Sequence, residues 1–373
     1  MRLGGAECFI LRWPEPNDFG HDRMTLLLRL DSADGVSGWG EAIGMWPEAL
    51  RAIRVVIQDG LLPLLGGRDL RDVEALWHAM KAQTWWYGEG GLATLALSAV
   101  DMALWDLRAK DAGVPLVQLF GAAHRSLPAC ASLHVNQATI DDSVRDIAGH
   151  FAGGFRSAKL GLGKRGLSRA GRDPDYDVQL VQALRDAVGT GAGIMVDAGN
   201  GTVWDLPTAV RTVNRMAEAG IGWIEEPFHP TNIAAHQALK AAVRTRVAAG
   251  EREYTLAGYT RWIESGAVDV FGLDPARVEG VTGFRRAAAA IEAAGCTVNA
   301  HAWSTAVLTG ASLHLSLASP SAELFELKPL PGPMQFDLVD EPFWHRGGLV
   351  AAPDRPGHGA EPRADVLARY RVE

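Results

Sequence analysis

The chain has 373 residues, which is more than one domain usually contains, so we expect a catalytic domain with a smaller companion. Apolar residues make up 47% and charged residues 21% of the sequence, so the chain can bury a large core and is not expected to be disordered. The net charge of -8, without a dense run of Lys or Arg, argues against a nucleic-acid-binding protein, which needs a basic stripe.

The chain opens with a predicted hairpin. Residues 24–31 and 36–42 are strand-like runs, and Asp34-Gly35 between them favours a tight turn because Gly accepts a positive φ. We therefore expect antiparallel sheet in this region.

A helical region follows, from about residue 47 to residue 109. Apolar residues near its end recur three or four positions apart, which predicts one buried helix face. These residues are Leu97, Val100, Leu104 and Leu107. The sequence Gly113-Val114-Pro115 then predicts the end of the helix.

From about Ser126, short apolar runs alternate with Ala-rich helical stretches. Continuous apolar runs predict strands buried on both faces, and strand–helix alternation predicts a parallel sheet. Eight such units in roughly 215 residues match the size of a closed β/α barrel, for which about 250 residues are typical. The eight runs are LPACASLH, SAKLGL, GIMVDAG, IGWIEEP, TRVAAGE, VDVFGLD, TVNAHAW and LFELKP.

The same alternation occurs in an open, doubly wound sheet, and periodicity alone does not separate the two architectures. No G-x-G-x-x-G sequence follows the first strand, so a dinucleotide site is not indicated. The last segment, from about Asp340, contains a turn-forming sequence at residues 353–357. We expect this segment to be irregular and to fold back onto the first unit.

Most of the predicted barrel strands end in a charged side chain. The carboxyl ends of barrel strands converge on one face, where active sites form. A single charge there is more often a helix cap or a surface group, but several crowded together would repel unless metal and proton chemistry compensated. The seven groups are Lys159, Asp197, Glu225, Glu251, Asp274, His301 and Glu326.

Three carboxylates, those of Asp197, Glu225 and Glu251, follow consecutive predicted strands. Their oxygens are hard ligands that suit an octahedral Mg²⁺ ion with positions open for substrate, whereas Ca²⁺ usually takes more ligands. A zinc hydrolase of barrel fold would favour His-x-His on the first strand, but the sequence there is Leu133-His134-Val135-Asn136. We therefore expect Mg²⁺ as the cofactor.

Asp274 and His301 end neighbouring predicted strands. A carboxylate beside an imidazole fixes its tautomer and raises its basicity, which makes His301 the candidate general base. The alternative is a core histidine bonded to the backbone, which the nearby carboxylate disfavours.

In these residues and their order along the chain, the sequence resembles the enolase superfamily, in its mandelate racemase and muconate lactonizing branch. The resemblance covers nearly the whole chain, and the order and spacing of the short motifs make it specific. The matching segments are residues 98–106, 113–116, 196–198, 223–227, 249–251, 268–270 and 300–303.

The resemblance implies a modified barrel, (β/α)7β, over residues 126–340. It also implies an α+β capping domain over residues 1–125, onto which residues 341–373 are expected to pack. In the active site it implies Mg²⁺ on Asp197, Glu225 and Glu251, with Glu225 rather than Glu226 as the ligand, and an Asp274-His301 dyad.

The chemistry of this family is removal of the proton next to a carboxylate. The product is a doubly negative enediolate, which a divalent metal stabilises as a Lewis acid in a site of low dielectric constant. The resemblance implies that Lys159 and Glu326 flank the substrate carboxylate and the enediolate from opposite sides.

The second barrel strand departs from the family pattern. It often reads Lys-x-Lys, with the second lysine as a base opposite the histidine, but here it reads Lys159-Leu160-Gly161. Because Gly161 moves no proton, an acid-sugar dehydratase is favoured over a racemase, epimerase or cycloisomerase. Some such dehydratases place an acidic histidine where this chain has Gly199, so the acid stays open, with Lys159 and His134 as candidates.

Substrate selection in this family lies with capping-domain loops, here residues 13–23 and 44–48. Their aromatic residues, which include Trp13 and Phe19, either close a lid over the substrate or pack between the domains. The candidates for substrate contact are His21, Trp46, His134 and Trp303. The sequence Trp85-Trp86-Tyr87, which is followed by several glycines, is more typical of a packing or subunit contact.

The three cysteines are scattered without a Cys-x-x-Cys pair, which indicates neither a disulfide framework nor a zinc site. The N-terminus lacks the pattern of a signal peptide, and no apolar stretch reaches the roughly 18 residues of a membrane span. We therefore expect a cytoplasmic homo-oligomer that binds a small carboxylate and no nucleic acid or membrane.

Overall fold

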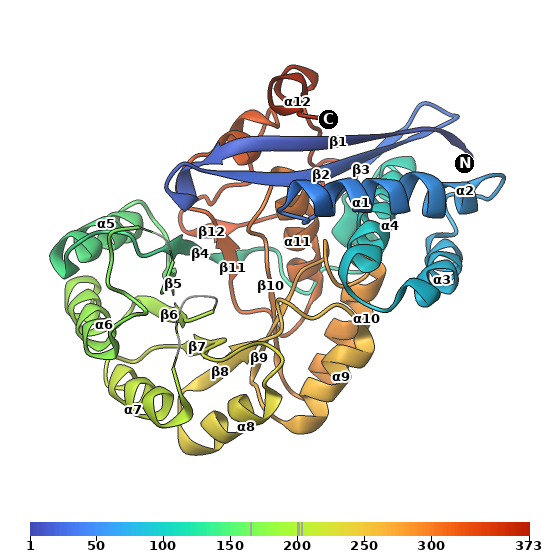
Figure 1. The fold of residues 1–373 in the computed structure, drawn as a ribbon. Helices are drawn as coiled ribbons and strands as arrows, with labels where there is room; N and C mark the ends of the chain where they lie inside the picture. Colours follow the sequence, from blue (N-terminus) through green and yellow to red (C-terminus); the bar gives the residue numbers. More distant parts are fainter. Residues whose placement is uncertain (165, 200–201, 203) are drawn as a thin grey trace.

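The computed structural model describes residues 1–164, 166–199, 202 and 204–373, arranged as Figure 1 shows. In this part of the chain, eight parallel strands form a nearly closed barrel with helices around it. A three-stranded antiparallel sheet with its own helices lies across one end of the barrel. The predicted fold, an α/β barrel with an α+β cap, is confirmed. The domain limits at residues 125 and 340 stay predictions.

The antiparallel sheet has the order β1–β2–β3. The pair β2 and β3 is the predicted hairpin, and Gly35 in its turn has a φ of 85°. The strand β1 lies outside the predicted runs, although it pairs with β2 from Leu3 opposite Ser32 to Glu15 opposite His21. Two glycines near its start obscure its alternation. The strands are β1 (Leu3–Glu15), β2 (His21–Ser32) and β3 (Ser37–Ala42).

The predicted helical region contains four α-helices, of which α4 is the longest. The four residues expected to share its buried face are all buried. Trp85, Trp86 and Tyr87 are 62, 77 and 53% exposed, so they are not part of the core, and a subunit contact stays a prediction. The helices are η1 (Pro16–Asp18), α1 (Pro47–Val55), η2 (Val56–Leu61), α2 (Leu62–Leu65), α3 (Val73–Thr84), η3 (Trp85–Tyr87), α4 (Gly91–Asp111) and η4 (Leu116–Leu119).

Each of the eight predicted barrel runs contains one strand, and neighbouring strands pair in parallel in the order β11–β4–β5–β6–β7–β8–β9–β10. Their continuous apolar sequences agree with burial on both faces. The strands are β4 (Leu127–His134), β5 (Ser157–Gly161), β6 (Gly193–Asp197), β7 (Trp223–Glu225), β8 (Arg246–Ala249), β9 (Val270–Leu273), β10 (Thr297–Ala300) and β11 (Phe325–Leu327). The helices between them are α5 (Ile140–Ala152), α6 (Pro174–Val188), α7 (Leu206–Ala217), α8 (Ile233–Ala242), α9 (Leu256–Ser265), α10 (Gly280–Ala293) and α11 (Ala306–Ala318).

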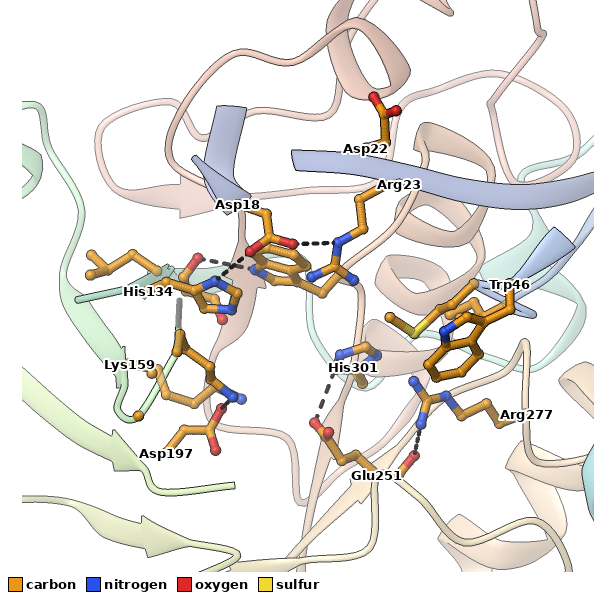
Figure 2. Close-up of a pocket in the computed structure, with 18 residues that line it drawn as sticks. Asp18, Asp22, Arg23, Trp46, His134, Lys159, Asp197, Glu251, Arg277 and His301 are labelled. Atoms are coloured by element: carbon orange, nitrogen blue, oxygen red, sulfur yellow. Dashed lines mark hydrogen bonds and ion pairs between the residues drawn. The ribbon is translucent and has the colours of Figure 1, made fainter. Parts of the chain in front are cut away.

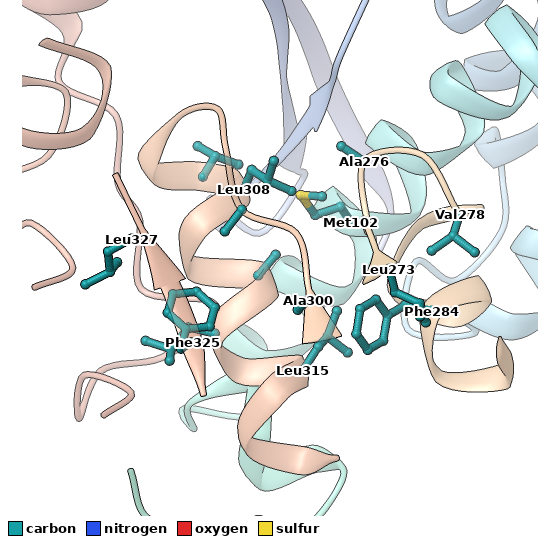
Figure 3. Close-up of a cluster of buried hydrophobic side chains, with 14 of the residues drawn as sticks. Met102, Leu273, Ala276, Val278, Phe284, Ala300, Leu308, Leu315, Phe325 and Leu327 are labelled. Atoms are coloured by element: carbon teal, nitrogen blue, oxygen red, sulfur yellow. The ribbon is translucent and has the colours of Figure 1, made fainter. Parts of the chain in front are cut away.

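A continuous apolar core joins the barrel to its cap. Figure 3 shows Phe325 and Leu273 from the strands against Phe284 and Leu315 from the outer helices, with Met102 of α4 close by. None of the helices in the described part of the chain is both long and apolar enough to cross a membrane.

The last segment contacts both units. The short strand β12 (Leu349–Val350) pairs with β4, and the backbone of Val372 donates to the carbonyl of Ile10 in β1 at 2.9 Å. The expectation of irregular structure is wrong for part of it, because residues 364–370 form α12 (Ala364–Tyr370). The helix is short and follows a turn-rich sequence, so the sequence pattern did not indicate it. A further short helix, η5 (Pro333–Asp337), precedes this segment.

Buried carboxylates of the cap receive donors from the barrel helices. Asp101 of α4 accepts the N–H and the hydroxyl of Thr282, in the first turn of α10, at 2.8 and 2.7 Å. Glu41 of β3 accepts the hydroxyl of Thr305 at 2.6 Å and the N–H of Leu308, in the first turn of α11, at 3.2 Å. Burial raises the pKa of Asp101 to about 7 and also raises that of Glu41. These bonds satisfy first-turn N–H groups and fix the sheet over the barrel.

Asp106 of α4 joins three segments that are far apart in the sequence. It accepts the N–H of Trp39 in β3 at 3.0 Å and the N–H of His358 in the C-terminal segment at 2.8 Å. Lys110, one turn along α4, lies 2.7 Å from the same carboxylate. The Asp106 side chain is fully buried, so no water replaces these partners.

We predict that Asp106→Ala lowers the free energy of unfolding by about 3–5 kcal/mol, because it leaves a partly buried lysine and two buried N–H groups without their acceptor. Urea denaturation followed by tryptophan fluorescence measures the change. The control is Asp111→Ala, at the exposed end of the same helix. A loss as small as that of the control would show that Asp106 does not hold these segments together.

Candidate active site at the barrel mouth

A cavity of about 400 Å³ lies where the carboxyl ends of the barrel strands meet the cap (Figure 2). Its wall contains Lys159, Asp197 and His301 from the barrel, together with Arg23 and Trp46 from the cap. Both units therefore form it.

The predicted strand-end carboxylates converge at this mouth. Asp197 and Glu225 end β6 and β7 and are direct register partners, and Glu251 follows β8 by two residues. Asp197 and Glu251 line the cavity, whereas Glu225 lies buried behind them. Burial raises the pKa of Glu225 well above its usual value.

Lys159 lies at the centre of these acids. Its Nζ is 3.0 Å from Oε2 of Glu225 and 2.9 Å from Oε2 of Glu326. Burial lowers the pKa of Lys159, but the carboxylates outweigh burial and raise it well above its usual value. The structure therefore places Lys159 and Glu326 in one ion pair, and their positions around the substrate stay a prediction. Glu326 also accepts from the amide of Asn299 at 2.6 Å.

The two consecutive glutamates at the end of β7, Glu225 and Glu226, face different partners. Glu226, which has a φ of 42°, pairs with Arg252 and accepts the N–H of Gly250 at 3.3 Å. Arg252 also lies 3.2 Å from Glu251. Burial raises the pKa of Glu226 to about 7. Glu226 is therefore paired with Arg252, whereas Glu225 is the member of the pair that faces Lys159.

The donor set fits Mg²⁺ by its chemistry, because Asp197, Glu225 and Glu251 supply only hard carboxylate oxygens. Among the residues that the structure describes, no three His, Cys, Asp or Glu side chains stand together as a ligand cluster. The carboxylates of Asp197, Glu225 and Glu251 instead contact lysine, arginine and histidine side chains. A buried carboxylate such as Glu225 is the kind of group that a divalent cation stabilises most in its charged form. Their role as ligands stays a prediction.

The predicted dyad is formed. Nδ1 of His301 lies 2.7 Å from Oδ2 of Asp274. The Asp274 side chain is fully buried, and its other oxygen accepts the N–H of Ala276 at 2.8 Å. This contact leaves Nε2 of His301 on the cavity side, 3.7 Å from Glu251. An imidazole oriented by a buried carboxylate is suited to take up a proton.

Three of the four predicted substrate contacts line the cavity, namely Trp46, His134 and Trp303. The fourth, His21, lies exposed at the start of β2 and is not part of the wall. Trp13 is buried, with its indole N–H 3.1 Å from Glu15, so it belongs to the core and not to a lid.

The structure adds charged residues that the sequence analysis did not single out. Asp18 and Arg23 come from the loop in which only aromatic and histidine side chains were considered. Arg277 follows Asp274 by three residues and pairs with it at 3.4 Å. Lys164 follows the glycine-rich end of β5 and donates to the carbonyl of Gly199 at 2.6 Å. All four residues are charged and lie in a predicted capping loop or within three residues of a predicted strand end. That position was the signal that could have identified them.

Two family models match the chain. The mandelate racemase/muconate lactonizing enzyme N-terminal domain matches residues 20–121, and the enolase C-terminal domain-like family matches residues 142–366. D-galactarolactone cycloisomerase of Agrobacterium fabrum is 29% identical over 94% of this chain and 92% of its own length. Arabinonate dehydratase of Saccharolobus solfataricus is 26% identical over 95% of this chain and 92% of its own length. Further relatives are dehydratases, cycloisomerases and an epimerase.

Solved structures show the same similarity. L-talarate dehydratase from Polaromonas sp. JS666, solved with Mg and L-glucarate, has a TM-score of 0.87 and 27% identity, covering all of this chain and 98% of its own. The two family models together span most of the described cap and barrel. The chain therefore belongs to the mandelate racemase/muconate lactonizing enzyme family of the enolase superfamily.

Proposed function

We propose that this protein is a Mg²⁺-dependent lyase that removes the proton next to the carboxylate of a sugar acid and then expels water from the neighbouring carbon. The observation that carries the proposal is the His301-Asp274 dyad, which shares a cavity wall with Asp197 and Glu251. Relatives that are sugar-acid dehydratases support the substrate class.

His301 takes the proton from the carbon next to the substrate carboxylate, and Asp274 stabilises the imidazolium that forms. Lys159, which stays charged because of its raised pKa, offers positive charge to the substrate oxygens from the barrel floor. Asp197, Glu225 and Glu251 would hold Mg²⁺, which supplies Lewis-acid stabilisation of negative charge on the substrate carboxylate.

Gly161 favours elimination over racemisation. In the family pattern the second lysine of Lys-x-Lys is the base opposite the histidine, and position 161, which ends β5, has no side chain to take that role. If only His301 removes the proton, the electron pair leaves most simply by breaking the C–O bond on the neighbouring carbon.

A cycloisomerase is the second candidate. D-galactarolactone cycloisomerase and 3,6-anhydro-alpha-L-galactonate cycloisomerase are both 29% identical to this chain over 94% of its length. In a lactone or an anhydro sugar acid, the oxygen on the neighbouring carbon is part of a ring, so the same proton abstraction would open the ring without releasing water.

We predict that EDTA abolishes turnover and that Mg²⁺ restores it, because the crowded carboxylates need a divalent cation. The Asp197→Ala, Glu225→Ala double variant is expected to lose turnover and Mn²⁺ binding together, with binding measured by electron paramagnetic resonance. Glu218→Ala, on the exposed end of α7, is the control. Wild-type turnover by the double variant would show that these residues are not the ligands.

We predict that arabinonate, D-gluconate or galactarate, incubated in D₂O with the enzyme and Mg²⁺, gives a 2-keto-3-deoxy acid without inversion at the second carbon. The His301→Asn variant should form product at least about 100-fold more slowly, because it lacks the base, while it still binds Mn²⁺. Nuclear magnetic resonance follows product and configuration. Ring opening of D-galactarolactone alone would favour the second candidate, and an inverted, deuterated substrate without keto acid would contradict elimination.

A further inference from the structure

The space beside Gly161 is filled by other residues. A Cβ atom at position 161 would lie 3.0 Å from Cδ2 of His134 and 3.2 Å from Cε of Lys164. Lys164 is held by the carbonyl of Gly199 and lies 3.8 Å from the carboxylate of Asp197. His134, at the end of β4, is therefore the titratable group on this side that has no contact with a proposed metal ligand.

His134 has a carboxylate behind it. Its Nδ1 is buried and has no hydrogen-bond partner within the described residues, and it points to Oδ1 of Asp18 at an ion-pair distance of 3.5 Å. Asp18 ends η1, in the turn between β1 and β2, and its other oxygen accepts from Nε of Arg23 at 2.9 Å. The cap thus supplies the partner of a barrel histidine (Figure 2).

The arrangement resembles that of His301. In both cases Nδ1 faces an aspartate, which leaves Nε2 as the nitrogen that can reach a substrate, and both side chains are almost equally exposed, 14% for His134 and 13% for His301. Trp303 stacks on the imidazole of His134 with ring centroids 4.6 Å apart and so fixes its plane. Both histidines line the same cavity.

We infer that His134, oriented by Asp18, is the general acid that protonates the departing oxygen. The inference rests on the proposed function. His301 first removes the proton from the second carbon, which gives the enediolate. Its electron pair then forms a C–C double bond as the C–O bond at the third carbon breaks, and the oxygen leaves with the proton of His134 as water. The enol tautomerises to the keto acid, His301 releases its proton to solvent, and solvent returns a proton to His134. Asp18 is a positioning residue that acts through His134.

Charges on several elements set the protonation of His134. Burial lowers its pKa, and the nearby cations Lys164 and Arg23 lower it further, whereas the carboxylate of Asp18 raises it. Asp18 is therefore the group that favours the protonated form of His134, against burial and the two cations, which together lower its pKa. Since only protonated His134 is active, turnover should fall as pH rises through its pKa. Neutralising Asp18 should move that fall to lower pH.

We predict that His134→Gln slows keto-acid formation by about 10²–10⁴-fold, because the amide donates a hydrogen bond but no proton. Exchange of the proton on the second carbon with D₂O should persist within about tenfold of wild type, because His301 supplies it. Asp18→Asn should slow product formation less and shift the alkaline limb of the pH profile to lower pH. His150→Gln on α5, away from the cavity wall, is the control and should match wild type.

Two results would overturn the inference: product formation by His134→Gln at the wild-type rate, or loss of exchange and product together in a variant that melts like wild type. The proposed function fails separately, because the wild-type enzyme would then form no product from any acid tested. In that case, nuclear magnetic resonance titration of histidine-labelled protein still decides the pairing. The pKa of His134 should fall in Asp18→Asn, and an unchanged value would refute the role of Asp18.

Discussion

A buried carboxylate must have a cation or several donors, and this requirement governs both the architecture and the site of the protein. At the joint between cap and barrel, Asp101 and Glu41 accept from the first turns of two barrel helices. At the mouth, Lys159 and Arg252 neutralise four acids at three strand ends. The same rule that holds the two units together therefore concentrates charge where they meet.

Much of the fold could be predicted because it depends on local patterns. Continuous apolar runs between Ala-rich helices located all eight barrel strands, since strands buried on both faces leave no other signature. The strand β1 and the helix α12 escaped because two glycines weaken the alternation of the first and a turn-rich sequence precedes the second. For the site, regular strand-end positions identified His301 and Asp274, whose contact the structure confirms.

The remaining features of the site depend on contacts between distant segments. No spacing in the sequence relates Asp18 to His134, which are brought together only when the β1–β2 turn docks over β4. The pairing of Lys159 with Glu326 likewise arises because β11 closes the barrel next to β4. His21 lies outside the cavity wall, although Arg23, two positions further along the same strand, is part of it. Such details follow from tertiary packing and not from periodicity.

His134 packs against the face of Gly161 where a Cβ atom would stand, and this contact limits which residues can occupy position 161. The Cβ of any side chain at position 161 would lie 3.0 Å from Cδ2 of His134 and 3.1 Å from the carbonyl of Leu133. A lysine there would need the imidazole to shift by a few tenths of an ångström, which would disturb its stacking on Trp303. Positions 161 and 134 are therefore coupled through packing, so the effect of a substitution at one of them depends on the residue at the other.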